Sequence, residues 1–491
     1  MEILKRGRME MAADLQDKIT AFINEHENDM IAELSALCSI DSVRTEAVPG
    51  APFGPGPKKA LDAATEIYRK YGFPVTDYEN KVRTADFGGE EPGLDIIAHV
   101  DVVPAGEGWI VTGPFCPVLR DGRLYGRGTA DDKCGVIVTV YAMRALKELG
   151  IKLSKRCRLI TGSAEETGME DVEAYYKKEK TAPMTITPDA DYPVINIEKG
   201  RIGAFYDAQF PASDGEKKLV ILDGGIAVNQ VPATARGVVA GIPAAKIREE
   251  AEKITRKTGV TFVVKTAEEE ECLSAGFPGG TCVSILAQGR AAHASTPHLG
   301  RNSVLALSEL VLALGLDDCP GLRTLDTFIK HHPFGEFDGT HAGIAAKDEV
   351  SGATTLSADI IRMTQTAFHA ETDARTAVCA DEMDYQGILD RIAGEMNVSV
   401  AIEGYPSHIV PGDSDFVKTL NKVYEDVTGL KGGCVAIGGS SYVHHVEGGV
   451  AFGCLPEGDE ANIHGPNESM SVDWLKKTAV IYAMVMAELC N

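Results

Sequence analysis

The sequence predicts an α/β protein whose first domain is built on a mainly parallel β-sheet and is interrupted by an inserted α+β domain. Two observations lead to this prediction. From residue 94 to residue 195, short apolar runs alternate with loops and helical stretches, as in βαβ units. From about residue 197 the pattern changes to longer alternating strands and amphipathic helices. With 491 residues, the chain is long enough for two or three domains.

The elements of the first domain follow from their apolar spacing. Residues 94–98 are expected to form a strand, and residues 158–160 and 184–186 are two further candidate strands. A helix is expected between the first two, because apolar residues recur at helical spacing before a glycine placed to end it. These residues are Val136, Val140, Met143, Leu146 and Gly150. Open α/β sheets bind ligands beyond the carboxyl ends of their strands, so a functional site is expected there.

The inserted domain is expected over residues 198–404, between residues 1–197 and 405–491 of the first domain. Its candidate strands, read from alternating apolar residues, are residues 233–239, 259–264 and 398–402. The acidic run at residues 268–271 is interpreted as a solvated face or loop. After Pro411, the apolar residues 435–437 and 450–452 are expected to return the chain to the first sheet.

Composition excludes several classes of partner. The chain has 48 Lys and Arg against 72 Asp and Glu, a formal charge of −24, which argues against nucleic acid or an anionic membrane as a partner. Its 11 cysteines include no C-x-x-C pair and are expected to be reduced. The first 20 residues lack the apolar core of a signal peptide, and no run of about 18 apolar residues occurs. A cytoplasmic protein is expected.

Acidic and histidine residues gather at the predicted strand ends. His99 and Asp101 lie two residues apart on an extended chain, where Asp101 is suited to accept a hydrogen bond from the ring of His99. Taken one at a time, such groups also fit a structural His-Asp pair or a helix cap. Like charges converging at one edge would repel one another unless cations were present. The other acids of the group are Asp131, Asp132, Glu165, Glu166, Asp189 and Asp191.

The order of these motifs is similar to that of a known family. The segments H-x-D, G-R-G-x-x-D-D-K, E-E-x-G and P-D, with a late N-I-H-G-P-N-E, resemble the two-metal exopeptidases that include aminoacylases, carnosinases and carboxypeptidase G (peptidase family M20). Residues 52–57 and 99–109 are most similar to PepV-type bacterial dipeptidases. The resemblance implies a dinuclear metallopeptidase that hydrolyses dipeptides. The alternatives are an N-acyl amino acid amidohydrolase and a non-catalytic peptide-binding protein that retains the fold.

The resemblance also implies roles for individual residues. His99 and Asp189 would hold one metal ion, Glu166 and His464 the other, and Asp131 would bridge them, with Glu165 as general base. Three carboxylates and one hydroxide would balance the charge of two divalent cations. The oxygen and imidazole ligands suit zinc, and also manganese or cobalt. The sequence departs from the family pattern at Ala164, where an aspartate often stands, and at Cys134, where a glycine is common.

Residues of the inserted domain resemble the part of the family that closes over the substrate as a lid. His293, in G-R-A-A-H-A-S-T-P, matches the histidine that stabilises the oxyanion. Asn229 and Arg362 match substrate-binding residues, and the backbone at Gly439 and Ser440 is a candidate site for a terminal carboxylate. The insertion is long enough for two lid units side by side, so the resemblance implies a monomer in which His293 serves its own active site.

Overall fold

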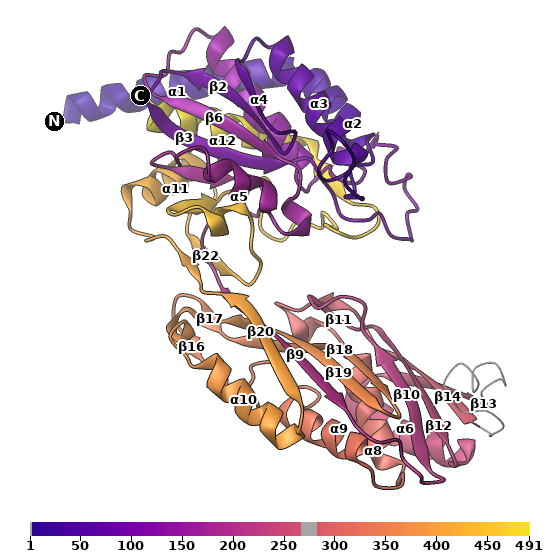
Figure 1. Ribbon diagram of the computed structural model, residues 1–491. Coiled ribbons are helices and arrows are strands. Elements are labelled where there is room, and N and C mark those ends of the chain that lie inside the picture. Colours follow the sequence, from indigo (N-terminus) through magenta and orange to yellow (C-terminus); the bar gives the residue numbers. More distant parts are fainter. Residues whose placement is uncertain (1, 267–281) are drawn as a thin grey trace. The chain divides into compact units, whose positions relative to one another are not determined.

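The computed structural model describes residues 2–266 and 282–491 (Figure 1). The chain forms two compact units. Unit 1 comprises Met1–Ile197, Ile409–Val435 and Ser440–Asn491, and unit 2 comprises Glu198–His408 and Ala436–Gly439. The acidic run at residues 268–271 lies outside the described residues. Among the helices that the structure describes, none is both long and apolar enough to cross a membrane.

Unit 1 is built on a mixed nine-stranded sheet in the order β1-β2-β6-β3-β7-β23-β8-β21, with β22 paired to β8. The central strands β6, β3, β7 and β23 run parallel, as predicted, whereas the β1–β2, β2–β6 and β23–β8 pairs are antiparallel. The strands are β1 (Val75–Tyr78), β2 (Val82–Gly88), β3 (Pro92–His99), β6 (Arg156–Gly162), β7 (Thr185–Thr187), β8 (Val194–Glu198), β21 (His408–Ile409), β22 (Cys434–Ile437) and β23 (Gly449–Ala451).

The two faces of this sheet are covered by different helices. Along β3, Leu94 and Ile96 point into the larger core, and Ile97 points into a smaller core on the other face, as the period of two in a strand requires. The smaller core is formed with α5 (Glu170–Tyr176) and the 3₁₀ helix η4 (Tyr442–His445). The helices of the larger core are α1 (Glu2–Glu25), α2 (Glu27–Cys38), α3 (Pro55–Lys70), α4 (Lys133–Glu148), α11 (Asp415–Thr428) and α12 (Val472–Leu489).

The helix predicted between the first two strands is α4. It ends before Gly150, which has a φ of +73° and is therefore in the left-handed region that glycine tolerates. Near its start, the buried Lys133 Nζ donates to the carbonyls of Leu37 and Ile40, 3.1 and 3.0 Å away, at the end of α2. A positive charge there satisfies carbonyls that have no partner within α2 and stabilises its negative end.

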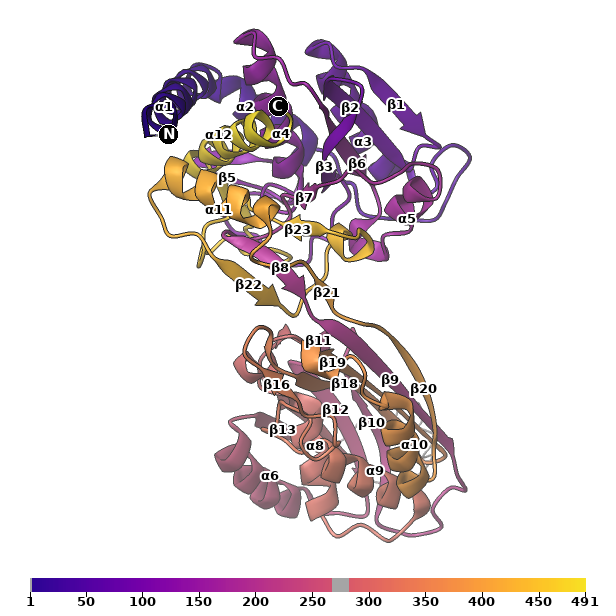
Figure 2. The same ribbon diagram turned by 90° about the vertical axis from the view of Figure 1, so that its left-hand side faces the viewer.

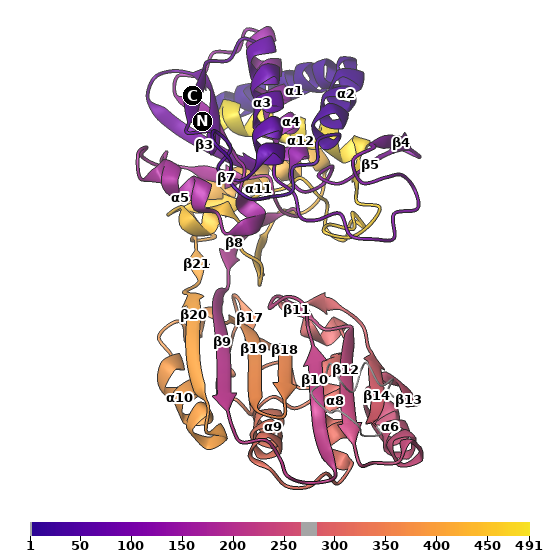
Figure 3. The same ribbon diagram turned by 45° about the vertical axis from the view of Figure 1, so that its right-hand side comes forward.

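Unit 2 is built on an eight-stranded antiparallel sheet in the order β13-β14-β12-β10-β18-β19-β9-β20. Its helices α6 (Ala244–Thr258), α8 (Ser303–Ala313), α9 (Pro320–His331) and α10 (Tyr385–Met396) pack against one face (Figures 2 and 3). The strands are β9 (Gly200–Gln209), β10 (Lys218–Gly224), β12 (Thr234–Ala240), β13 (Thr261–Thr266), β14 (Cys282–Gln288), β18 (Thr355–Thr364), β19 (Ala367–Thr376) and β20 (Ser399–Tyr405).

Shorter pairings complete the two units. In unit 2, β11 (Gln230–Val231) pairs with β15 (Ala292–His293), and β16 (Lys347–Asp348) pairs with β17 (Gly352–Ala353). In unit 1, β4, β5 and β24 form a three-stranded sheet. Their bounds are Val118–Arg120, Arg123–Tyr125 and Ser469–Ser471. Every strand predicted from the sequence has a counterpart, and the ends differ by up to about three residues.

Candidate metal centre

Three neighbouring parallel strands deliver their following residues to one edge of the unit 1 sheet. β3 ends at His99, β6 leads into the 3₁₀ turn η1 (Glu165–Thr167), and Asp189 lies two residues beyond β7. Because β6, β3 and β7 are adjacent and parallel, their carboxyl ends meet. Asp131 joins them from the loop before α4.

Asp131 lies between two histidines. Its Oδ1 is 3.0 Å from His99 Nε2, and its Oδ2 is 2.9 Å from His464 Nε2. Asp189 Oδ2 lies 3.6 Å from His99 Nε2, and Glu166 Oε2 lies 3.2 Å from His464 Nε2. The structure therefore brings together all five residues that were predicted as metal ligands, with one carboxylate facing both halves of the cluster.

The donor atoms fit divalent metal ions. His99 Nε2 and Asp131 Oδ1 are buried, yet within the described residues neither has a hydrogen-bond partner. A cation between such atoms would satisfy both, where their lone pairs otherwise face each other. Two groups of three side chains could each hold a cation, because their potential ligand atoms lie within 4.8 Å of one another. The first group is His99, Glu165 and Asp189, and the second is His99, Asp131 and Glu166. Imidazole nitrogen and carboxylate oxygen suit zinc, manganese and cobalt alike.

The electrostatics of the cluster also favour a cation. Burial, and then the nearby negative charge of Asp189, raise the pKa of the Glu165 carboxyl well above its ordinary value. Burial and the charge of Asp131 raise the pKa of Glu166 to about 7. Although burial opposes the charged form of His464, hydrogen bonds with Asp131 and Glu166 raise its pKa to about 11. The cluster therefore favours the positively charged form of His464 and disfavours the negatively charged forms of Glu165 and Glu166, as expected of a site for a cation.

The sequence profile of peptidase family M20/M25/M40 matches residues 96–488. The chain belongs to this family. It is 31% identical to the putative dipeptidase YtjP of Bacillus subtilis, over 95% of this chain and 98% of the relative. It is also 31% identical to the Beta-Ala-Xaa dipeptidase of Lactobacillus delbrueckii subsp. lactis, over 94% and 96% of the two chains. Human carnosine dipeptidase 1 shares the fold, with a TM-score of 0.56 at 16% identity, over 97% of this chain and 99% of that one.

In this M20 peptidase, Asp101 contacts both the ring of His99 and the turn of the acid pair. The ring nitrogen Nδ1 of His99 lies 3.1 Å from the backbone carbonyl oxygen of Asp101 and 3.5 Å from its carboxylate Oδ1. The carboxylate also accepts hydrogen bonds from the backbone N–H groups of Glu165 and Glu166, each at 3.2 Å. Asp101 therefore orients His99 through its backbone and holds the acid pair through its side chain.

Two residues without a predicted role, Arg127 and Glu468, support the centre. Both are buried, and Arg127 Nη1 donates to Glu468 Oε2 at 2.6 Å. Glu468 Oε1 accepts from the backbone N–H groups of Ala130 and Asp131 at 2.9 and 3.3 Å. Arg127 Nη2 donates to the backbone carbonyl of His464 at 3.2 Å. The pair thus joins the loop of Asp131 to the loop of His464.

Glu468→Ala is expected to lower the free energy of unfolding by about 3 to 5 kcal/mol, because it leaves the guanidinium of Arg127 buried without a counter-charge. Urea unfolding of the metal-free protein measures this change. Asp426→Ala is the control, because Asp426 makes an exposed ion pair with Lys422, and there a change of at most about 0.5 kcal/mol is expected. Equal, small losses in both variants would contradict the structural role of the Arg127–Glu468 pair.

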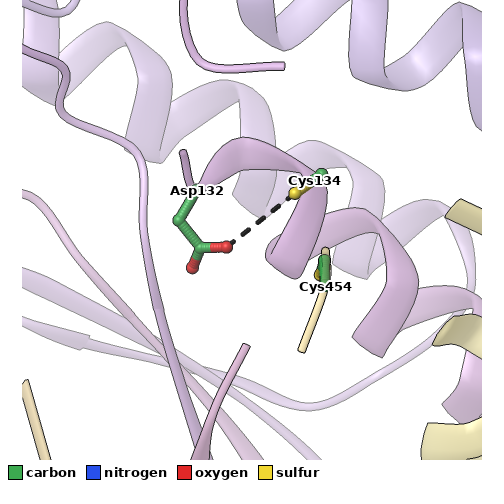
Figure 4. A group of neighbouring side chains, drawn as sticks. All are labelled: Asp132, Cys134 and Cys454. Carbon is green, nitrogen blue, oxygen red and sulfur yellow. Dashed lines mark hydrogen bonds between the residues drawn. The ribbon is translucent and has the colours of Figure 1, made fainter. Parts of the chain in front are cut away.

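The departure from the family pattern at Cys134 places a thiol beside Asp132 and Cys454 (Figure 4). All three side chains are fully buried. A hydrogen bond with Cys454, together with burial, raises the pKa of the Cys134 thiol, and burial raises that of Cys454. The Cys134 thiol also donates to the carbonyl of Ala130, 3.3 Å away. These three side chains form a buried group next to the proposed centre.

The predicted substrate-facing residues lie mainly in unit 2. The β11–β15 pairing places Asn229 beside His293, and Ala294 N–H donates to the Asn229 carbonyl at 2.9 Å. Arg362 lies on β18 with its side chain 55% exposed, and its Nε is 3.6 Å from Asp223 Oδ1. Gly439 belongs to unit 2, and Ser440 begins the last segment of unit 1.

Proposed function

We propose that this M20 peptidase is a dipeptidase that hydrolyses the peptide bond of dipeptides with the help of two divalent cations. The observation that carries the proposal is the position of Asp131 between His99 and His464, at 3.0 and 2.9 Å. The dipeptidase names of two relatives, each 31% identical over nearly the whole chain, support the substrate class.

We assign His99 and Asp189 to one cation, Glu166 and His464 to the other, and Asp131 to both. Short distances between the members of each group support this division. Bound there, the cations would polarise the scissile carbonyl and lower the pKa of the attacking water. Zinc is our first choice, and manganese and cobalt fit the same donor set.

Glu165 is assigned as the general base. It is 8% exposed and lies among the proposed ligands, so it can reach a water molecule held there. It would take a proton from the attacking water and deliver it to the leaving amine.

His293 is assigned to the oxyanion. Its Nδ1 accepts a hydrogen bond from the backbone N–H of Ser295 at 3.1 Å. The neutral ring therefore carries its proton on Nε2, which makes Nε2–H a donor for the charge that develops on the carbonyl oxygen. Asn229 and Arg362 would bind the substrate, with the Arg362 guanidinium and the backbone at Gly439 and Ser440 directed at its terminal carboxylate.

The second candidate function is removal of acyl groups from amino acids, which the same set of donors would support. A substrate panel separates the two: dipeptides with a free N-terminus are expected to be hydrolysed, and N-acetylated amino acids to be left largely intact. Faster turnover of the acetylated compounds would make the enzyme an amidohydrolase.

From the sequence we also propose that the protein is cytoplasmic and that neither nucleic acid nor a membrane is its partner.

We propose further that the enzyme works as a monomer, with His293 serving the active site of its own chain. Glu165→Gln and His293→Ala are each expected to be inactive, and mixing them under conditions of subunit exchange is expected to restore no activity. The length of unit 2, Glu198–His408, supports this expectation. Recovered activity in the mixture, which would place a histidine across subunits, would overturn the proposal.

A further inference from the structure

Carboxylates hold four consecutive backbone N–H groups at the turn that carries the acid pair. Glu165 and Glu166 donate to the two oxygens of Asp101, each at 3.2 Å. Ser163 and Ala164, just before them, donate to Oδ2 of Asp171 at 2.6 and 2.9 Å. The position of the turn therefore depends on Asp171 as much as on Asp101.

Asp171 is itself fixed from a distant part of the chain. The Tyr442 hydroxyl donates to Asp171 Oδ2 at 2.7 Å, and both side chains are fully buried. A Cβ atom on Gly162 would lie 2.0 Å from the Tyr442 hydroxyl and 2.6 Å from Asp171 Oδ2, so only glycine leaves room for this contact. A buried carboxylate with several donors has its position closely defined.

Tyr442 also contacts the proposed metal ligand His99. The two rings meet edge to face, with centroids 6.2 Å apart and planes at 85°. The Tyr442 hydroxyl thus holds the acid-pair turn through Asp171, while its ring packs against the imidazole on the neighbouring strand β3. One side chain thereby contacts both Asp171, which accepts from the acid-pair turn, and a proposed metal ligand.

We propose that Asp171 and Tyr442 are positioning residues that hold Glu165 and Glu166 in their reactive geometry. The inference rests on the proposed roles of these two acids. A displacement of about 1 Å of a reacting group can cost about a hundredfold in rate. Loss of the single donor in Tyr442→Phe is expected to lower kcat about tenfold, and loss of the carboxylate in Asp171→Asn between about tenfold and a hundredfold, with KM changed by at most about twofold.

The test compares Tyr442→Phe and Asp171→Asn with a matched control, Tyr482→Phe. Tyr482 is also fully buried in unit 1, and its hydroxyl donates to the Phe452 carbonyl at 2.7 Å. Dipeptide kcat and KM, metal content and thermal midpoint are measured on the metal-saturated full-length enzyme. The visible spectrum of the Co²⁺-loaded protein adds a readout of ligand geometry that does not depend on turnover.

Support for the inference would be a lower kcat and an altered Co²⁺ spectrum in Tyr442→Phe and Asp171→Asn, with two metal ions retained and Tyr482→Phe close to the wild type. Wild-type kcat in Tyr442→Phe, or equal losses in Tyr442→Phe and Tyr482→Phe, would overturn it. Restoration of full activity by excess metal would also overturn it, because the pair would then serve metal affinity alone. Near-normal activity in fully metallated Glu165→Gln would instead refute the proposed role of Glu165 as the base, on which the inference rests.

Discussion

Glu165→Gln is expected to retain both metal ions and to lose activity by a factor of about 10² to 10⁴ in kcat, because the amide keeps the shape of the side chain but cannot accept a proton. Metal analysis and steady-state kinetics on the same preparation measure both parts of the prediction.

The matched control for this variant is Glu148→Gln. Glu148 lies on α4 with its side chain 46% exposed and makes a surface ion pair with Arg144. We expect its kcat to stay within about twofold of the wild type, because surface ion pairs contribute little. Near-normal turnover in a fully metallated Glu165→Gln enzyme would show that the base is another group.

Asp131→Ala is expected to lose metal binding as well as activity. In the wild type, saturating metal should raise the midpoint temperature of thermal unfolding, because a ligand that binds only the folded state stabilises that state. The variant should show almost no such rise, since Asp131 faces both His99 and His464. Although burial opposes its charged form, hydrogen bonds with His464 and His99 lower the pKa of Asp131, so its ionised form stabilises the folded protein and the metal-free variant should be less stable than the metal-free wild type.

Calorimetry with and without added metal measures this second prediction. Asp426→Ala again serves as the exposed control and should respond to metal like the wild type. Two metal ions bound to Asp131→Ala with unchanged affinity would mean that another residue bridges them.

The strand-end residues could be predicted from the sequence because their positions follow from local patterns. Apolar runs indicate β3, β6 and β7, and adjacent parallel strands bring the residues that follow them to one edge. The antiparallel outer pairs were not predicted. The link between β1 and β2 is a tight turn in which Glu79 and Asn80 have φ values of +58° and +56°, and so short a link permits only an antiparallel pair.

The groups that support the centre could not be predicted in the same way. Asp171 and Tyr442 are 271 residues apart, and Arg127 and Glu468 are 341 apart. Such contacts join side chains to each other or to backbone N–H groups and leave no periodic signal in the sequence. Asp101 shows the same limit, since the spacing of H-x-D suggests its contact with the His99 ring, whereas its hydrogen bonds from the backbone of Glu165 and Glu166 are visible only in the folded turn.

We expect this chain to hydrolyse dipeptides with two metal ions held around Asp131. The decisive experiment is a titration of the metal-free enzyme with Zn²⁺, Mn²⁺ or Co²⁺ that follows both bound metal and turnover of a panel of dipeptides. We expect no turnover without metal and activity that rises to a plateau at about two ions per chain. Full activity in the metal-free enzyme, or two bound ions without hydrolysis of any dipeptide, would contradict this expectation.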